Sequence, residues 1–147
     1  MSESKLPDFT TDPLSKLPED VVGKILALRV IAVVGLSAKP ERPSHYVSEY
    51  LQEQGYKIVP VNPGHHKILG EQCWPNVADI PFPIDIVAVF RRPEEALTPI
   101  LEAIAARAKA VWLQDGVHHE EGERMAREAG LLVVSNDCLM RRHARRG

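Results

Sequence analysis

The chain has 147 residues, of which 44% are apolar and 26% charged, and its formal net charge is -2. This length and composition predict an ordinary soluble globular protein with a single core. A slightly acidic balance argues against a nucleic-acid partner, because domains that bind nucleic acid are usually basic. The two cysteines lie far apart and predict neither a disulfide framework nor a cysteine-rich metal site. No apolar run is long enough to cross a membrane and no secretory signal is visible, so we expect a cytoplasmic protein without a membrane partner.

Residues 1–13 are polar and contain proline, and we expect a flexible N-terminal segment there. Over residues 14–140, apolar runs alternate with helical patterns, which predicts a single domain. Continuous apolar runs are typical of parallel strands that are buried on both faces. They predict strands at 30–34, 57–61, 84–90, 110–113 and 131–134. Helical spacing predicts helices from residue 18, from residue 43, over 98–107 and over about 120–130. Residues 141–147 form a basic C-terminal tail that we expect to be frayed.

This alternation predicts an α/β, Rossmann-like, doubly wound parallel sheet of five strands with helices on both faces. With the strands numbered along the chain, we predict the order 3-2-1-4-5. That order places the topological switch point beside the first strand, where the carboxyl ends of the strands form a ligand crevice.

The loop after the first strand is the first candidate for a ligand site. It reads GLSAKPERPS over residues 35–44 and precedes a predicted helix, whose N-terminal amides and dipole attract anions. Gly35 allows a ligand to approach the backbone, and amides from Leu36 onward are the expected phosphate donors. Ser37 adds a hydroxyl, while Lys39 and Arg42 place two cations beside a space of pyrophosphate size. A plain strand–helix turn with solvated charges is the alternative interpretation.

The ends of the second and third strands narrow the choice of ligand. Rossmann enzymes that bind NAD usually carry an acidic residue at the end of the second strand, where it binds the ribose hydroxyls. Here that end reads Val61-Asn62-Pro63 and has no carboxylate, whereas Arg91 and Arg92 follow the third strand. A ligand with a pyrophosphate and one further phosphate explains the cations together. Coenzyme A and NADP are both ligands of this kind.

Four segments occur together in this chain: IAVVGLSAKPERPSHYVSEYLQEQGYKIVPVNPG, ILGEQCWPNVADIPFPIDIVAVFRRPEE, AVWLQDGV and NDC. Over roughly residues 18–140 they resemble the family of small stand-alone CoA-binding proteins, which is related to the CoA-binding domain of succinyl-CoA synthetase alpha subunits. The resemblance implies a Rossmann-like domain that binds coenzyme A or an acyl-CoA at the strand ends. By position, the implied site contains Gly35, Ser37, Lys39, Arg42, Pro43, Ser44, Val61, Asn62, Pro63, Phe90, Arg91, Arg92, Trp112, Leu113 and Gln114.

The chain departs from the family pattern in two places. Synthetase subunits continue into a second domain with a histidine that becomes phosphorylated, and this chain ends before such a domain. The family often has an arginine before the cysteine that follows the fifth strand, whereas here Asp137 precedes Cys138. The Cys138 thiol would face the crevice and could exchange disulfides with the thiol of coenzyme A. The Asp137 carboxylate would oppose formation of a thiolate, and a buried structural cysteine is the alternative interpretation.

The histidines predict no further chemistry. The pairs at 65–66 and 118–119 lack the spacing of a metal motif, and we interpret them as solvated loop residues. His45 has no paired nucleophile or orienting acid, so we expect no catalytic residue. We therefore expect a CoA-binding or regulatory module, with a homodimer and a partner enzyme subunit both open. The alternatives are the CoA-binding subunit of an acyl-CoA synthetase-type enzyme and an NAD(P)-binding redox sensor.

Overall fold

The structure is a computed structural model that describes residues 21–146. The expected flexible segment at 1–13 and the start of the first predicted helix lie outside the described residues. The remainder of that helix is present, because residues 21–26 are helical.

The five predicted strands form one parallel sheet, as expected for buried apolar runs. They are β1 (Val30–Val34), β2 (Lys57–Val61), β5 (Ile86–Val89), β6 (Ala110–Leu113) and β7 (Leu132–Val134). The helices are α2 (Pro43–Glu53), α3 (Leu97–Ala105), α4 (Glu120–Glu128) and α5 (Leu139–Arg146). A small hairpin of β3 (Lys67–Ile68) and β4 (Glu71–Gln72) and the 3-10 turns η1 (Val77–Asp79) and η2 (Pro93–Glu95) complete the described elements.

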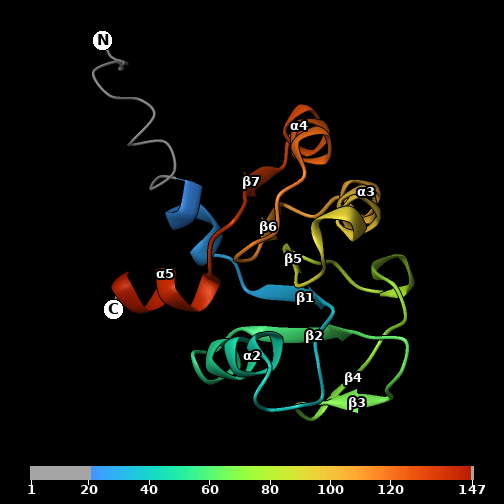
Figure 1. The fold of residues 1–147 in the computed structure, drawn as a ribbon, viewed down its shortest axis with the longest axis vertical. Helices are drawn as coiled ribbons and strands as arrows, with labels where there is room; N and C mark the ends of the chain where they lie inside the picture. The colour runs from blue at the N-terminus through green and yellow to red at the C-terminus, as the bar shows by residue number, and fades with distance from the viewer. Residues whose placement is uncertain (1–20, 147) are drawn as a thin grey trace.

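The sheet lies between two helical layers, so the prediction of helices on both faces is confirmed (Figure 1). Alternate strand residues point to opposite faces. Ile31 and Val33 therefore pack into the core beside α2, α5 and residues 21–26, while Ala32 and Val34 pack into the core beside α3 and α4. Burial on both faces explains why the strands read as unbroken apolar runs.

The predicted strand order is wrong. The observed order is β2-β1-β5-β6-β7, which is 2-1-3-4-5 when these strands are counted along the chain. The outer edge of β2 is covered by the segment that follows it, since the Trp74 amide donates to the Pro60 carbonyl at 3.0 Å and the Asn62 amide donates to the Trp74 carbonyl at 2.9 Å. The third strand therefore pairs with the free edge of β1. The switch point still lies beside β1, now between β1 and β5.

The expectation of a frayed basic tail is also wrong. Residues 139–146 form α5, whose Leu139 is buried in the same core as α2. The side chain of His143 meets the Tyr50 hydroxyl at 2.8 Å and also packs edge-on against Tyr56. The Tyr50 contact docks α5 against α2. No helix within residues 21–146 is long and apolar enough to cross a membrane.

Candidate ligand-binding site

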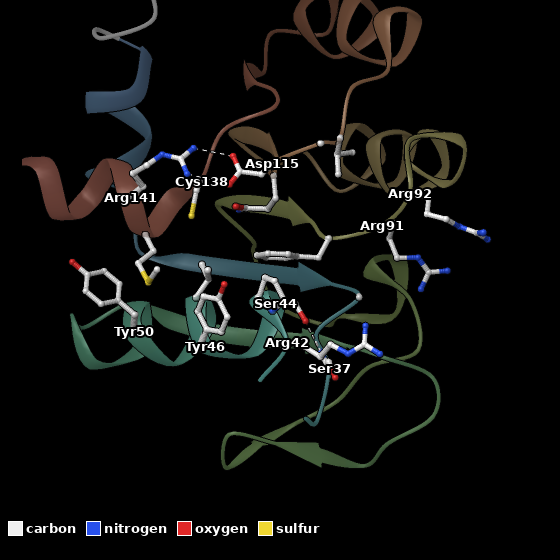
Figure 2. Close-up of a pocket in the computed structure, with 18 of the residues that line it drawn as sticks. Ser37, Arg42, Ser44, Tyr46, Tyr50, Arg91, Arg92, Asp115, Cys138 and Arg141 are labelled. Carbon is white, nitrogen blue, oxygen red and sulfur yellow. Dashed lines mark hydrogen bonds and ion pairs between the residues drawn. The ribbon is translucent and has the colours of Figure 1, made fainter. Parts of the chain in front are cut away.

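A cavity of about 1110 Å³ lies at the carboxyl edge of the sheet, between α2, α5 and the loops that follow β1, β5 and β6 (Figure 2). The predicted site residues that line it are Gly35, Ser37, Arg42, Pro43, Ser44, Phe90, Arg91, Arg92 and Gln114. Cys138, expected on the crevice side, lines it as well. The crevice expected at the switch point is therefore present as a cavity of ligand size.

Gly35 lies at the point where the first loop crosses the end of β5. Its φ of +88° belongs to the region that favours glycine, and a Cβ there would lie 2.5 Å from the Phe90 carbonyl oxygen. The Gly35 amide donates to the Val61 carbonyl at 3.1 Å. The loop after β1 thus crosses directly over the end of β5, and only a residue without a side chain fits at that crossing.

Two hydroxyl groups hold the rest of this loop. Ser44 Oγ accepts from the Ser37 amide at 2.9 Å, and Ser37 Oγ accepts from the Lys39 amide at 3.0 Å. The Ser37 and Lys39 amides are therefore already bonded within the loop, although we expected amides from Leu36 onward to be phosphate donors. Charged groups must then carry a larger share of any anion binding at this end.

Several predicted site residues do not line the cavity: Leu36, Lys39, Val61, Asn62, Pro63, Trp112 and Leu113. Leu36 is a fully buried core residue. Asn62 donates from Nδ2 to the Leu36 carbonyl at 2.8 Å, so the end of β2 supports the first loop from behind. A resemblance identifies such positions but does not separate residues that hold a loop from residues that face a ligand.

The arginines at the loop end of the cavity differ in their partners. Arg91 lies 3.4 Å from Glu95, and Arg92 lies 3.1 Å from Glu95 and 3.8 Å from Glu94. The hydrogen bond from Arg92 lowers the pKa of Glu95. Arg42 is exposed and has no ion pair among residues 21–146. Of the three arginines at this end, Arg42 is therefore the one whose charge no described carboxylate offsets.

The opposite end of the cavity is formed by α5. Arg141 contacts Asp115 with two nitrogens, at 2.8 and 3.1 Å, and Asp137 at 3.1 Å. The hydrogen bond from Arg141 lowers the pKa of Asp115. Gln114 is only 3% exposed, and its Oε1 accepts from the Leu139 amide at 3.4 Å. Its Nε2 is buried without a hydrogen-bond partner among the described residues.

Sequence reasoning missed part of the cavity wall. The lining residues that we did not predict are Tyr46, Val47, Tyr50, Pro93, Glu95, Asp115, Gly116, Val117, Met140, Arg141 and Ala144. Val47 and Tyr50 lie three residues apart in α2 and share one face of that helix. Met140 and Ala144 are four residues apart and share one face of α5. The part of the cavity wall that α5 forms follows once residues 139–146 are recognised as a helix.

The second histidine pair has a structural role. His119 Nδ1 accepts from the Gly122 amide at 3.0 Å, and Glu123 accepts from the His119 amide at 2.8 Å, a pair of reciprocal bonds like that of a capping box but with the acid one residue later. His118 Nδ1 lies 2.8 Å from the same buried Glu123. His118 and His119 therefore fix the start of α4. Within residues 21–146, no group of three histidine, cysteine, aspartate or glutamate side chains is arranged to hold a metal ion.

A doubly wound parallel sheet with a cation-bearing cavity at its carboxyl edge defines a Rossmann-like ligand-binding domain. Residues 29–144 match the family model of the CoA binding domain. The chain therefore belongs to that family, and the family expected from the sequence motifs is confirmed.

The relatives are of two kinds. Uncharacterized protein YneT of Bacillus subtilis is 42% identical over 114 residues, which cover 78% of this chain and 84% of YneT. A hypothetical protein from Pyrococcus horikoshii OT3 has a solved structure that matches with a TM-score of 0.82 at 40% identity, covering 99% of this chain and 98% of that one. The alpha subunit of acetate–CoA ligase [ADP-forming] II from Pyrococcus furiosus is 27% identical over 129 residues. That match covers 79% of this chain and only 28% of the subunit.

Proposed function

We propose that this protein binds coenzyme A, or an acyl-CoA, in the cavity at the carboxyl edge of the sheet, as a binding or regulatory module without its own catalysis. The observation that carries the proposal is the chemical asymmetry of the cavity. One end holds Arg42, whose charge no carboxylate of residues 21–146 offsets, with Arg91 and Arg92 nearby. The other end holds Gln114, whose buried amide nitrogen has no acceptor in the part of the chain that the structure describes.

Coenzyme A has matching chemistry from end to end. Its phosphates would lie at the loop end, where Arg42 offers a planar fork that can take a phosphate oxygen pair. Its pantetheine arm is long and partly apolar, and the cavity wall between the two ends carries Tyr46 and Val47 from α2 and Met140 from α5. Its amide carbonyls are acceptors of the kind that the Gln114 Nε2 group needs. Membership of the CoA binding domain family supports the same ligand.

The test is calorimetric titration of the full chain with coenzyme A, dephospho-CoA, acetyl-CoA, NAD and NADP under reducing conditions. We expect coenzyme A to bind more tightly than dephospho-CoA, because the additional phosphate gains a charge-assisted contact, and NAD to bind weakly. Ligand-induced thermal stabilisation should follow the same order. Binding of NAD or NADP as tight as that of coenzyme A would contradict the proposal. The acetyl-CoA titration separates a site for free coenzyme A from a site for the thioester.

The absence of catalysis is tested separately. The pure protein should not turn over acetyl-CoA, because the His45 ring does not line the cavity and Ser37 is bonded within its own loop. Steady hydrolysis of acetyl-CoA that disappears in Ser37→Ala or His45→Ala would overturn this part of the proposal.

A second candidate is the CoA-binding part of an acyl-CoA synthetase-type assembly. It is favoured by the match to the acetate–CoA ligase alpha subunit, of which this chain spans about a quarter. In that case the protein would contribute to ligase activity only when mixed with a nucleotide-binding partner subunit. Activity reconstituted with such a partner, and lost in Arg42→Ala, would favour the assembly over the stand-alone module.

A further inference from the structure

We propose that Cys138 is a thiol–disulfide exchange site, at which the protein captures the thiol end of its ligand as a mixed disulfide. The inference rests on the proposed function, because a thiol-bearing ligand must enter the cavity first. Its co-reactant is a disulfide of coenzyme A.

Cys138 occupies the end of the cavity away from the loop cations. Figure 2 shows its sulfur directed into the space between α5 and α2, on the side of Tyr50 and far from Arg91 and Arg92. The residue is 7% exposed, so its route to solvent is the cavity itself. Cys73 is similarly buried, at 8% exposed, but does not line the cavity. The two free cysteines thus differ in access to a bound ligand rather than in burial.

A second feature at the same end also requires a ligand. The Gln114 Nε2 group is buried beside the cavity with no acceptor among residues 21–146. A buried amide without a partner is costly, and a carbonyl of an entering ligand would remove that cost. Pantetheine has an amide carbonyl close to its thiol. A ligand arm that meets Gln114 would therefore place its sulfur in the region of Cys138.

The surroundings of Cys138 favour a reactive sulfur. Asp137, which from sequence alone should oppose a thiolate, is 3.1 Å from Arg141 and 3.5 Å from Arg142, so its charge is offset. The carbonyl of Cys138 accepts from the Arg142 amide at 3.0 Å, which places the residue at the N-terminal end of α5. Helix N-termini stabilise thiolates.

The Cys138 backbone is also held in place. The Trp112 indole donates to the Asp137 carbonyl at 3.0 Å, and the Asp137 carboxylate accepts from the Cys138 amide at 2.8 Å. In the proposed step, the Cys138 thiolate attacks one sulfur of the disulfide. A bond forms between Sγ and that sulfur, the original S–S bond breaks, and the departing thiolate takes the proton that Cys138 lost. One disulfide is consumed and one is made, so the exchange needs no further oxidant.

The experiment measures intact mass after the full chain is mixed with coenzyme A disulfide or with oxidised glutathione. We expect one coenzyme A adduct per chain, removed by dithiothreitol, in the wild type and in Cys73→Ser but not in Cys138→Ser. The coenzyme A disulfide should react at least about tenfold faster than glutathione disulfide, because a bound ligand holds its sulfur next to Sγ. Cys138→Ala repeats the test without a buried hydroxyl.

A parallel titration with reduced coenzyme A separates the two proposals. Tight non-covalent binding with no adduct on Cys138 would overturn the exchange site and leave the proposed function in place. The exchange site would also be overturned by equal rates for the two disulfides, or by an adduct that persists in Cys138→Ser and Cys138→Ala. If reduced coenzyme A does not bind, the proposed function fails, and the exchange site fails with it.

Discussion

Both ends of the cavity carry guanidinium groups, but the two ends differ in whether a carboxylate neutralises the guanidinium charge. At the loop end, Arg42 is exposed and has no carboxylate partner within residues 21–146. At the α5 end, Arg141 is bonded to Asp115 and also to Asp137. The first arrangement leaves positive charge available for an anion. The second uses its charge to fix a wall, so the number of arginines near a site does not measure its attraction for phosphate.

The ends also differ in what determines their shape. The loop end is set by close backbone approach, since Gly35 crosses the Phe90 carbonyl where no Cβ fits. The α5 end is set by side-chain bonds from Gln114 and Arg141 to distant parts of the chain. Changes at the loop end should therefore act through the backbone or the ligand, and changes at the α5 end through the stability of the wall.

The largest expected effect is on folding. Gly35→Ala should lower the free energy of unfolding by roughly 2–4 kcal/mol, because a left-handed backbone is strained for alanine and its Cβ overlaps the Phe90 carbonyl. Gly116→Ala, at the other end, is the matched control. It has a φ of +81° but nothing within 4 Å of the added Cβ, so it should cost about 1–2 kcal/mol. Urea midpoints measure both, and equal losses would mean that the crossing at Phe90 relaxes freely.

The next effect is on ligand affinity. Arg42→Ala should weaken coenzyme A binding by about 1.5–3 kcal/mol, or roughly ten- to a hundredfold, through loss of charge-assisted hydrogen bonds. Lys39→Ala is the control, because Lys39 lies on the same loop but not on the cavity, and its loss should change affinity little. The urea midpoint of either ligand-free variant should stay close to that of the wild type. Unchanged affinity in Arg42→Ala would show that the phosphates bind elsewhere.

A smaller effect concerns the α5 wall and depends on pH. Because Arg141 holds the pKa of Asp115 below its usual 3.8, this carboxylate stabilises the fold above that pH. The contribution is lost as the pH falls through the lowered value. Asp115→Asn should therefore cost about 0.5–1 kcal/mol at neutral pH, and its difference from wild type should vanish well below pH 3.8. The substitution should have no effect in an Arg141→Ala background, and an unchanged cost there would contradict the pairing.

The smallest expected effect is a gain. Glu95→Gln removes the carboxylate shared by Arg91 and Arg92 and should tighten coenzyme A binding by roughly two- to fivefold, the scale of an exposed ion pair. Glu94 lies 3.8 Å from Arg92, and Glu94→Gln should change affinity less. Both gains should shrink in high salt. A loss of affinity in Glu95→Gln would mean that Glu95 orients the arginines for the ligand instead of competing with it.

One residue in the sequence, Pro60, indicates the observed strand order. Pro60 lies inside β2, and its missing N–H falls on the side that faces Trp74 rather than β1. Proline within a sheet is confined to edge strands, because a central strand needs that donor. Pro60 therefore indicates that β2 ends the sheet. This excludes the order 3-2-1-4-5, in which the second strand is central, and leaves the edge of β1 for the third strand.

Sequence alone determined the features that depend on residues close together along the chain. The buried strands follow from unbroken apolar runs, and the close crossing of the first loop follows from Gly35 at the end of β1. The cations at the strand ends follow from the same local reading, since parallel strands bring their carboxyl ends to one edge. Tertiary structure alone decided which of these charges remain available. Arg141 meets Asp115 from 26 positions away in the chain, and Gln114 meets the first amide of α5 from 25 positions away. Such pairings depend on how helices dock across the sheet, and no local pattern records that.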